Sequence, residues 1–140
     1  MVLLDTNVVS EVRKVRLGTA DPNVARWSET LDTAALFISI VTIHELEIGI
    51  LLAERRDPPL GAIFREWLET RVLSAFAGRI LPLDVAVARR AAKLHVPDPR
   101  PINDAFIAAT ALVHGLTVAT RNLAAARPLG LKGRMRRIRR

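Results

Sequence analysis

The sequence predicts an α/β fold, in which helices cover both faces of a central parallel sheet. Short apolar runs typical of strands alternate with helical patterns along the chain, which is the order that produces parallel strands joined by helices. The strand-like runs are almost continuously apolar, as expected for strands buried on both faces. A chain of 140 residues, half of them hydrophobic, is long enough for one core and too short for two.

The expected elements are bounded by turn signals or by changes in hydrophobic period. They are a strand at 2–4, a helix at 7–12, a loop at 13–21, a helix at 23–31, a strand at 36–40, a helix at 42–55, a helix at 60–76, a short strand or extended segment at 79–83, a helix at 84–94, an irregular loop at 96–101, a helix at 102–114 and a strand at 116–120. Three prolines define the irregular loop, and Gly115 stands where a helix commonly ends.

The net charge of +7 is concentrated at the C-terminal end. Residues 127–140 hold seven basic residues and no acid, which leaves 14 basic residues against 14 acids in the rest of the chain. We therefore expect a domain at 1–126 and a basic, mobile tail at 127–140. The alternative is that the tail contacts RNA or a protein partner, since clustered basic residues bind phosphates by displacing counterions.

The composition excludes several classes of protein. The absence of Cys rules out disulfides and thiolate metal sites, and three scattered His argue against a zinc site. No apolar run reaches the roughly 20 residues needed to cross a bilayer, and the first residues do not resemble a signal peptide. We expect a cytoplasmic protein that does not contact a membrane.

Polar side chains are expected to meet at one edge of the sheet, because sites in parallel sheets form beyond the carboxyl ends of the strands. Asp5 ends the first strand, and Thr120 and Asn122 end the last. Glu45 falls in the first turn of the helix after the second strand, and Asp104 in the first turn of the helix before the last strand. Three carboxylates from distant segments are thus predicted to converge.

Each acid also has a purely structural interpretation. Residues 42–45, Thr-Ile-His-Glu, fit the capping box, in which Thr and Glu satisfy exposed backbone N–H groups. Asp104 or Asn103 could cap its helix, and Asp5 or Asn7 the first one. Caps need not gather at one edge, however, and acids near helix N-termini are also stabilised by the helix dipole. Both interpretations stay open at the level of sequence.

Convergence would require a cation, because close carboxylates repel one another and burial raises the cost of ionising them. Oxygen ligands without Cys or organised His favour a hard ion, Mg²⁺ or Mn²⁺. Such an ion can supply a water as nucleophile and offset charge on a phosphate. The pattern therefore favours metal-dependent hydrolysis of a phosphodiester.

Four segments resemble, in order, the motifs of PIN-domain ribonuclease toxins of the VapC type, close to the FitB-like subgroup. They are residues 2–11, 42–49, 104–117 and 120–122. The resemblance covers about 1–122 and implies a three-layer α/β/α fold, a divalent metal, endoribonuclease activity on RNA, a cognate antitoxin and a homodimer. By position, three residues match the family's acidic metal ligands and three match supporting polar residues: Asp5, Glu45 and Asp104, and Thr6, Thr120 and Asn122 respectively.

The sequence departs from the family pattern after Asn122. Ala125 stands near the position where the family usually has an acid, and a basic segment replaces the usual final apolar strand. This predicts one weak metal site and reduced nuclease activity. The alternative is a catalytically weak or inactive binding module that retains binding of RNA or of the antitoxin, the latter in a groove on the helices at 42–55 and 60–76. A phosphatase with Asp5 as nucleophile fits less well, because Asn7 replaces the second Asp of such enzymes.

Overall fold

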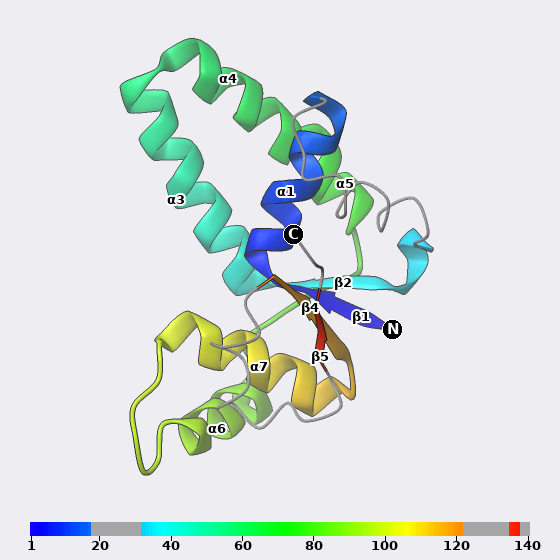
Figure 1. The fold of residues 1–140 in the computed structure, drawn as a ribbon, viewed down its shortest axis with the longest axis vertical. Helices are drawn as coiled ribbons and strands as arrows, with labels where there is room; N and C mark the ends of the chain where they lie inside the picture. Colours follow the sequence, from blue (N-terminus) through cyan, green and yellow to red (C-terminus); the bar gives the residue numbers. More distant parts are fainter. Residues whose placement is uncertain (18–31, 122–134, 138–140) are drawn as a thin grey trace.

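The computed structural model describes residues 1–17, 32–121 and 135–137, and it shows three layers (Figure 1). A parallel sheet lies between one group of helices drawn above it in Figure 1 and a second group drawn below. The strands are β1 (Val2–Leu4), β2 (Leu36–Ser39), β3 (Ile80–Leu81), β4 (Thr117–Thr120) and β5 (Met135–Arg137). The predicted α/β class, with helices on both faces of a parallel sheet, is confirmed.

The strand order is β3-β2-β1-β4-β5, and each neighbouring pair is parallel. Leu3 of β1 is in register with Phe37 on one side and Val118 on the other. The central position of β1 places its carboxyl end between those of β2 and β4. The residues that follow β1 therefore have neighbours on both sides at this edge.

The prediction that a final strand is missing is wrong. Within the basic segment, β5 pairs in parallel with β4, and Thr120 is in register with Arg137. Arginine-rich sequence gives no strand signal, but the free edge of β4 offers backbone donors and acceptors that any residue can pair with. The fold thus uses the backbone of this segment, whatever its charge.

The helices of the upper group are α1 (Thr6–Leu17), α3 (Ile40–Arg56), α4 (Pro58–Trp67) and α5 (Leu73–Ala75), and those of the lower group are α6 (Val85–Leu94) and α7 (Ile102–His114). A single 3₁₀ turn, η1 (Thr33–Ala35), precedes β2, and a π-helical segment, η2 (Leu68–Val72), joins α4 to α5. The loop predicted at 13–21 is wrong over its first five residues, because α1 continues through helix-favouring Arg and Lys. The helix predicted at 23–31 lies outside the described residues.

Helix ends follow the signals read from the sequence. The side chain of Asp84 accepts a hydrogen bond of 2.9 Å from the Val87 N–H and caps α6. Asp57 caps α4 in the same way and is followed by proline at the start of the helix. Gly115 ends α7 with φ of +68°, a left-handed conformation that favours glycine.

Hydrophobic cores lie on opposite faces of the sheet, as alternation along β1 requires. Leu4 packs with Val8, Ile38 and Leu46 beneath the upper helices. The neighbouring Leu3 packs on the opposite face with residues of α7 and β4. Because adjacent residues of β1 are buried on opposite sides, the direction in which Asp5 emerges is tightly fixed.

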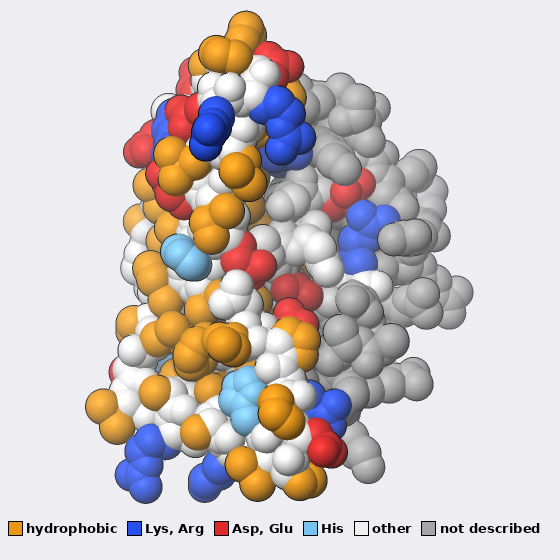
Figure 2. All heavy atoms as spheres, turned by 90° about the vertical axis from the view of Figure 1, so that its left-hand side faces the viewer, with side chains coloured by type: hydrophobic (Ala, Val, Ile, Leu, Met, Phe, Trp, Pro, Cys, Tyr) orange, Lys and Arg blue, Asp and Glu red, His pale blue; other side chains and the backbone are white. Residues whose placement is uncertain are grey.

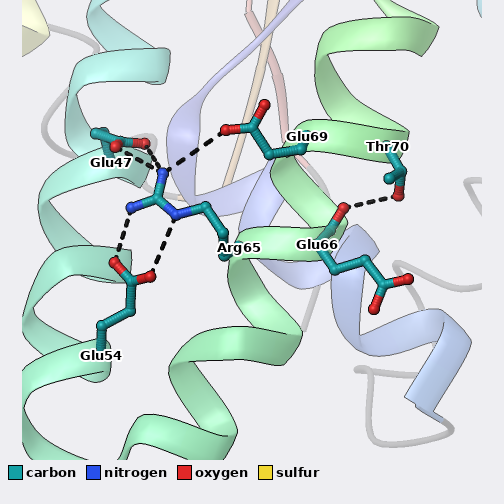
Figure 3. Close-up of polar contacts among 6 residues, drawn as sticks. All are labelled: Glu47, Glu54, Arg65, Glu66, Glu69 and Thr70. Carbon is teal, nitrogen blue, oxygen red and sulfur yellow. Dashed lines mark hydrogen bonds and ion pairs between the residues drawn. The ribbon is translucent and has the colours of Figure 1, made fainter.

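Helices α3 and α4 form a hairpin joined by one arginine (Figure 3). The Arg65 guanidinium lies between Glu47 and Glu54 of α3, with its Nη1 2.6 Å from Glu47 Oε1 and its Nη2 2.8 Å from Glu54 Oε1. Glu69, four residues further along, is 3.9 Å away. Gly61 permits this close approach, because a Cβ there would lie 2.4 Å from the Glu54 Cα. We call Arg65 with Glu47, Glu54 and Glu69 the hairpin cluster.

None of the helices among the described residues is long and apolar enough to cross a membrane.

Candidate active site

Asp5 is held at the carboxyl edge of the sheet by contacts from two sides. Its Oδ1 accepts a hydrogen bond of 2.8 Å from the Thr6 N–H at the start of α1. Its Oδ2 accepts one of 2.8 Å from Thr120 Oγ1 at the end of β4, and a longer one of 3.4 Å from Asn7 Nδ2. Thr120, which is 115 positions from Asp5 in the sequence, thus helps to fix its carboxylate. This contact lies beyond the carboxyl ends of the strands, where polar side chains were expected to meet.

Glu45 faces Asp5 from α3, and the capping-box interpretation is wrong. Ser39, the last residue of β2, caps α3 by accepting a hydrogen bond of 3.0 Å from the Val41 N–H. The helix therefore begins at Ile40, two residues before Thr42, and Glu45 lies in the second turn instead of the first. Its Oε1 accepts a hydrogen bond of 2.9 Å from Thr6 Oγ1.

Asp104 lies in the first turn of α7, where sequence also allowed a capping role. The residue at the cap position is Pro101, and no side chain caps the helix by hydrogen bonding. The capping interpretation of Asp104 and Asn103 is therefore wrong. The position of Asp104 near a helix N-terminus still favours negative charge there.

The acids are close enough for the charges of Asp5 and Asp104 to affect the ionisation of Glu45, and for the charge of Asp5 to affect that of Asp104. The pKa of Glu45 is raised, first by burial and then by the charges of Asp5 and Asp104, against the opposing effects of the Thr6 hydrogen bond and His44. The pKa of Asp104 is raised by burial and by the charge of Asp5. The structure thus brings together the three carboxylates that sequence predicted would meet. We call Asp5, Glu45 and Asp104 the site carboxylates.

The site carboxylates do not form a closed group of metal ligands. In the parts of the chain that the structure describes, no three His, Cys, Asp or Glu side chains form a group that could by itself hold a metal ion. Mg²⁺ commonly binds through one or two carboxylates and keeps several waters, so it does not require a closed group of three protein ligands. Figure 2 shows acidic side chains in the middle of one face, with hydrophobic side chains above and below.

The other residues singled out from sequence have distinct places. Thr6 and Thr120 each hydrogen-bond to a site carboxylate, whereas Asn122 lies outside the described residues. Glu47, two residues after Glu45 on α3, binds Arg65 in the hairpin cluster. Nothing in the sequence indicated that the Thr42 hydroxyl lies 3.0 Å from the Thr6 hydroxyl, because residues 42–45 match a capping signal.

A buried ion pair braces the chain directly after β4. Arg121 Nη1 lies 3.0 Å from Oε2 of Glu11 on α1, and the Glu11 side chain is only 9% exposed. The Arg121 N–H also donates to Asn7 Oδ1 at 3.5 Å. These contacts tie the end of β4 to the helix that follows Asp5, which supports the Thr120–Asp5 hydrogen bond.

The fold and the site define an α/β/α domain of parallel topology that gathers acids from three separate segments at the carboxyl edge of its sheet. The sequence model of the PIN domain matches residues 2–128, and the chain belongs to the PIN-domain family. PIN-domain ribonucleases depend on a divalent metal.

Named relatives extend over nearly the whole chain. Toxin FitB of Neisseria gonorrhoeae is 37% identical over 131 residues, which cover 87% of this chain and 88% of FitB. VapC ribonuclease Y4jK of Sinorhizobium fredii is 38% identical over 136 residues and 94% of each chain. The crystal structure of FitAcB from Neisseria gonorrhoeae superimposes with a TM-score of 0.83 at 34% identity, covering 93% of this chain and 94% of that one.

Proposed function

We propose that this chain is the toxin of a type II toxin–antitoxin pair and hydrolyses RNA phosphodiester bonds with Mg²⁺ or Mn²⁺. The observation that carries the proposal is the meeting of Asp5, Glu45 and Asp104, where the pKa values of Glu45 and Asp104 are raised first by burial and then by the charge of a neighbouring acid. Membership of the PIN-domain family and relatives named as toxin and ribonuclease support it. RNA as the substrate rests on those relatives.

Each residue of the site has a role in this proposal. Asp5, Glu45 and Asp104 would hold the ion directly or through water, and a bound ion would offset phosphate charge and activate a water. Thr120 orients Asp5, and Thr6 orients Glu45, by the hydrogen bonds described above. Groups that orient metal ligands commonly contribute tenfold or more to affinity or activity.

We propose that the antitoxin binds to the hairpin of α3 and α4. Apolar side chains on the two helices remain exposed to solvent in the isolated chain: Ile48, Leu51, Leu52, Leu60 and Ile63. An exposed apolar surface of this kind favours protein association, and amphipathic helices bind to such surfaces through apolar anchors. The solved relative named FitAB was determined bound to a DNA fragment. We also predict a homodimer, which light scattering of the purified chain would test.

The activity is further proposed to be lower than that of relatives with a complete fourth motif. Ala125 lies outside the described residues, so this part of the proposal rests on the sequence alone. Without an acid near this position, a second ion or the attacking water would be less firmly placed. Three carboxylates would still retain one ion.

The test is cleavage of structured RNA by the purified chain, with Mg²⁺ and then with EDTA, beside Asp5→Asn and Ala125→Asp variants. We expect cleavage that EDTA abolishes and that Asp5→Asn lowers at least about a hundredfold, because one carboxylate no longer offsets the ion's charge. Ala125→Asp should increase cleavage several-fold.

Three other results would contradict the proposal. RNA binding without cleavage at any Mg²⁺ or Mn²⁺ concentration would favour the inactive binding module. A covalent phosphate on Asp5, detected by mass spectrometry, would favour the phosphatase. An unchanged rate in Ala125→Asp would contradict only the reduced-activity hypothesis.

A further inference from the structure

The hydroxyl of Thr42 lies behind the site, in a fully buried position. Thr42 is 0% exposed, and its Oγ1 is 3.0 Å from Thr6 Oγ1. It precedes Glu45 by three residues, a spacing that places two side chains on the same face of a helix. Thr42 and Glu45 therefore approach the same Thr6 hydroxyl from neighbouring turns of α3.

The direction of these hydrogen bonds follows from counting protons. A threonine hydroxyl has one proton to donate and can accept from other donors. Thr6 donates its proton to Glu45 Oε1 at 2.9 Å, since an ionised carboxylate can only accept. Thr6 has no second proton for Thr42, so Thr42 must donate to Thr6.

We propose that Thr42 is a positioning residue for the site, because its hydroxyl fixes Thr6 in the orientation that donates to Glu45. This inference rests on the proposed function, in that Glu45 is taken to hold the cation. With Thr42 donating, Thr6 Oγ1 has an acceptor on one side and a donor on the other. Without Thr42, the Thr6 hydroxyl loses the partner that selects this rotamer, and Glu45 loses a firmly placed donor.

Two other roles for Thr42, helix capping and core packing, can be distinguished from positioning of Thr6. A capping role is excluded by Ser39, which already caps α3. A role limited to packing would be preserved by Thr42→Val, which keeps the β-branched shape and removes the hydroxyl. Thr42→Ser does the opposite, because it keeps the hydroxyl and removes the methyl group.

The test measures the Mn²⁺ dissociation constant of the full chain by electron paramagnetic resonance of the free ion, which needs no RNA. We expect Thr42→Val to weaken Mn²⁺ binding about five- to tenfold, as for other groups that orient metal ligands. Thr42→Ser should stay within about twofold of the wild type. In a Thr6→Ala background, Thr42→Val should have no further effect, because the two residues act as one unit.

The outcomes are distinct. Equal weakening by Val and Ser, or an undiminished effect of Thr42→Val in the Thr6→Ala background, would overturn the inference and indicate packing. If Thr42→Val does not fold, shown by loss of its thermal transition, Thr42→Ala takes its place in the same comparison. Hydroxyl-dependent Mn²⁺ binding without RNA cleavage would overturn the proposed function alone. No Mn²⁺ binding by the wild type would overturn both.

Discussion

Glu45 and Glu47 are two residues apart on α3, yet they belong to opposite kinds of acidic cluster. Glu47 faces α4 and binds Arg65 at 2.6 Å, in a cluster that contains its own cation. Glu45 faces the sheet edge and the other site carboxylates, and its contact there is the hydroxyl of Thr6. Among the described residues, no Lys or Arg forms an ion pair with Glu45 or Asp104.

The pKa shifts of the two clusters differ in sign. Arg65 lowers the pKa of Glu54 through hydrogen bonding and charge. The pKa values of Glu45 and Asp104 are raised, chiefly by burial and secondly by neighbouring acids. The hairpin cluster contains its own cation, whereas the site carboxylates are the acids to which we propose that a cation is added. This contrast, more than the number of acids, distinguishes a structural ion-pair cluster from a candidate metal site.

The largest difference is expected when the same substitution is made in each cluster. Glu45→Gln should lower Mg²⁺-dependent RNA cleavage at least about a hundredfold, because an amide cannot offset the charge of the ion. Glu47→Gln, on the same helix, should leave the cleavage rate within about twofold. Initial rates at saturating Mg²⁺ measure both variants under one set of conditions.

Stability provides the control for this pair. Glu47→Gln should lower the thermal unfolding midpoint, because Arg65 loses a charged partner, while Glu45→Gln should not. If both variants lost cleavage equally, or if Glu45→Gln lost it only because the protein had unfolded, the distinction between the clusters would fail.

A second experiment separates the helices of the hairpin cluster. At Gly61 a new Cβ would lie 2.4 Å from Glu54 Cα and 2.6 Å from its N, both backbone atoms that cannot move aside. Gly61→Ala should therefore force α4 away from α3 and lower the free energy of unfolding by about 1–3 kcal/mol. Urea denaturation followed by circular dichroism measures the loss.

Gly49→Ala is the matched control, because Gly49 is also helical and nothing lies within 4 Å of a Cβ there. This substitution should stabilise the chain by about 0.5–1 kcal/mol through helix propensity. A Gly61→Ala variant as stable as Gly49→Ala would show that close helix packing does not hold the hairpin.

Sequence predicted most of the fold because its signals are local. Apolar runs marked β1 and β2, Asp84 marked the start of α6, and Gly115 marked the end of α7. It missed β5, since strand pairing at a sheet edge uses the backbone and leaves no apolar pattern in an arginine-rich segment. The strand order likewise depends on contacts between distant segments, which no local pattern contains.

For the site, the sequence identified the acids but not the hydrogen bonds that position their carboxylates. Parallel topology predicts that Asp5, Glu45 and Asp104 lie near one another, and the charges of Asp5 and Asp104 do act on Glu45; their role as metal ligands stays a prediction. The sequence of residues 42–45 predicts a capping box, but the Thr42 hydroxyl contacts Thr6 instead. Only the position of Ser39 at the end of β2 decides between them. The i, i+3 spacing of Thr42 and Glu45 was the signal available for their shared helix face.

The smallest effect is expected in the pH dependence of stability, measured by thermal unfolding in EDTA. A raised pKa means that folded Glu45 holds its proton more tightly than unfolded Glu45. Its contribution to stability is therefore full below the ordinary pKa of 4.5 and is lost as pH rises through the raised value. Glu54 behaves oppositely, since its pKa is lowered: its contribution is present above 4.5 and is lost as pH falls through the lowered value.

The thermal unfolding midpoint of Glu45→Gln should consequently rise relative to that of the wild type as pH increases from 4 to 7. For a partly exposed group we expect a difference of roughly one or two degrees. The unfolding midpoint of Glu54→Gln should fall relative to that of the wild type over the same pH range. Mn²⁺ at pH 7 should remove the advantage of Glu45→Gln, because the ion stabilises only a protein that binds it. Parallel curves for the two variants would mean that the clusters do not differ in their need for a cation.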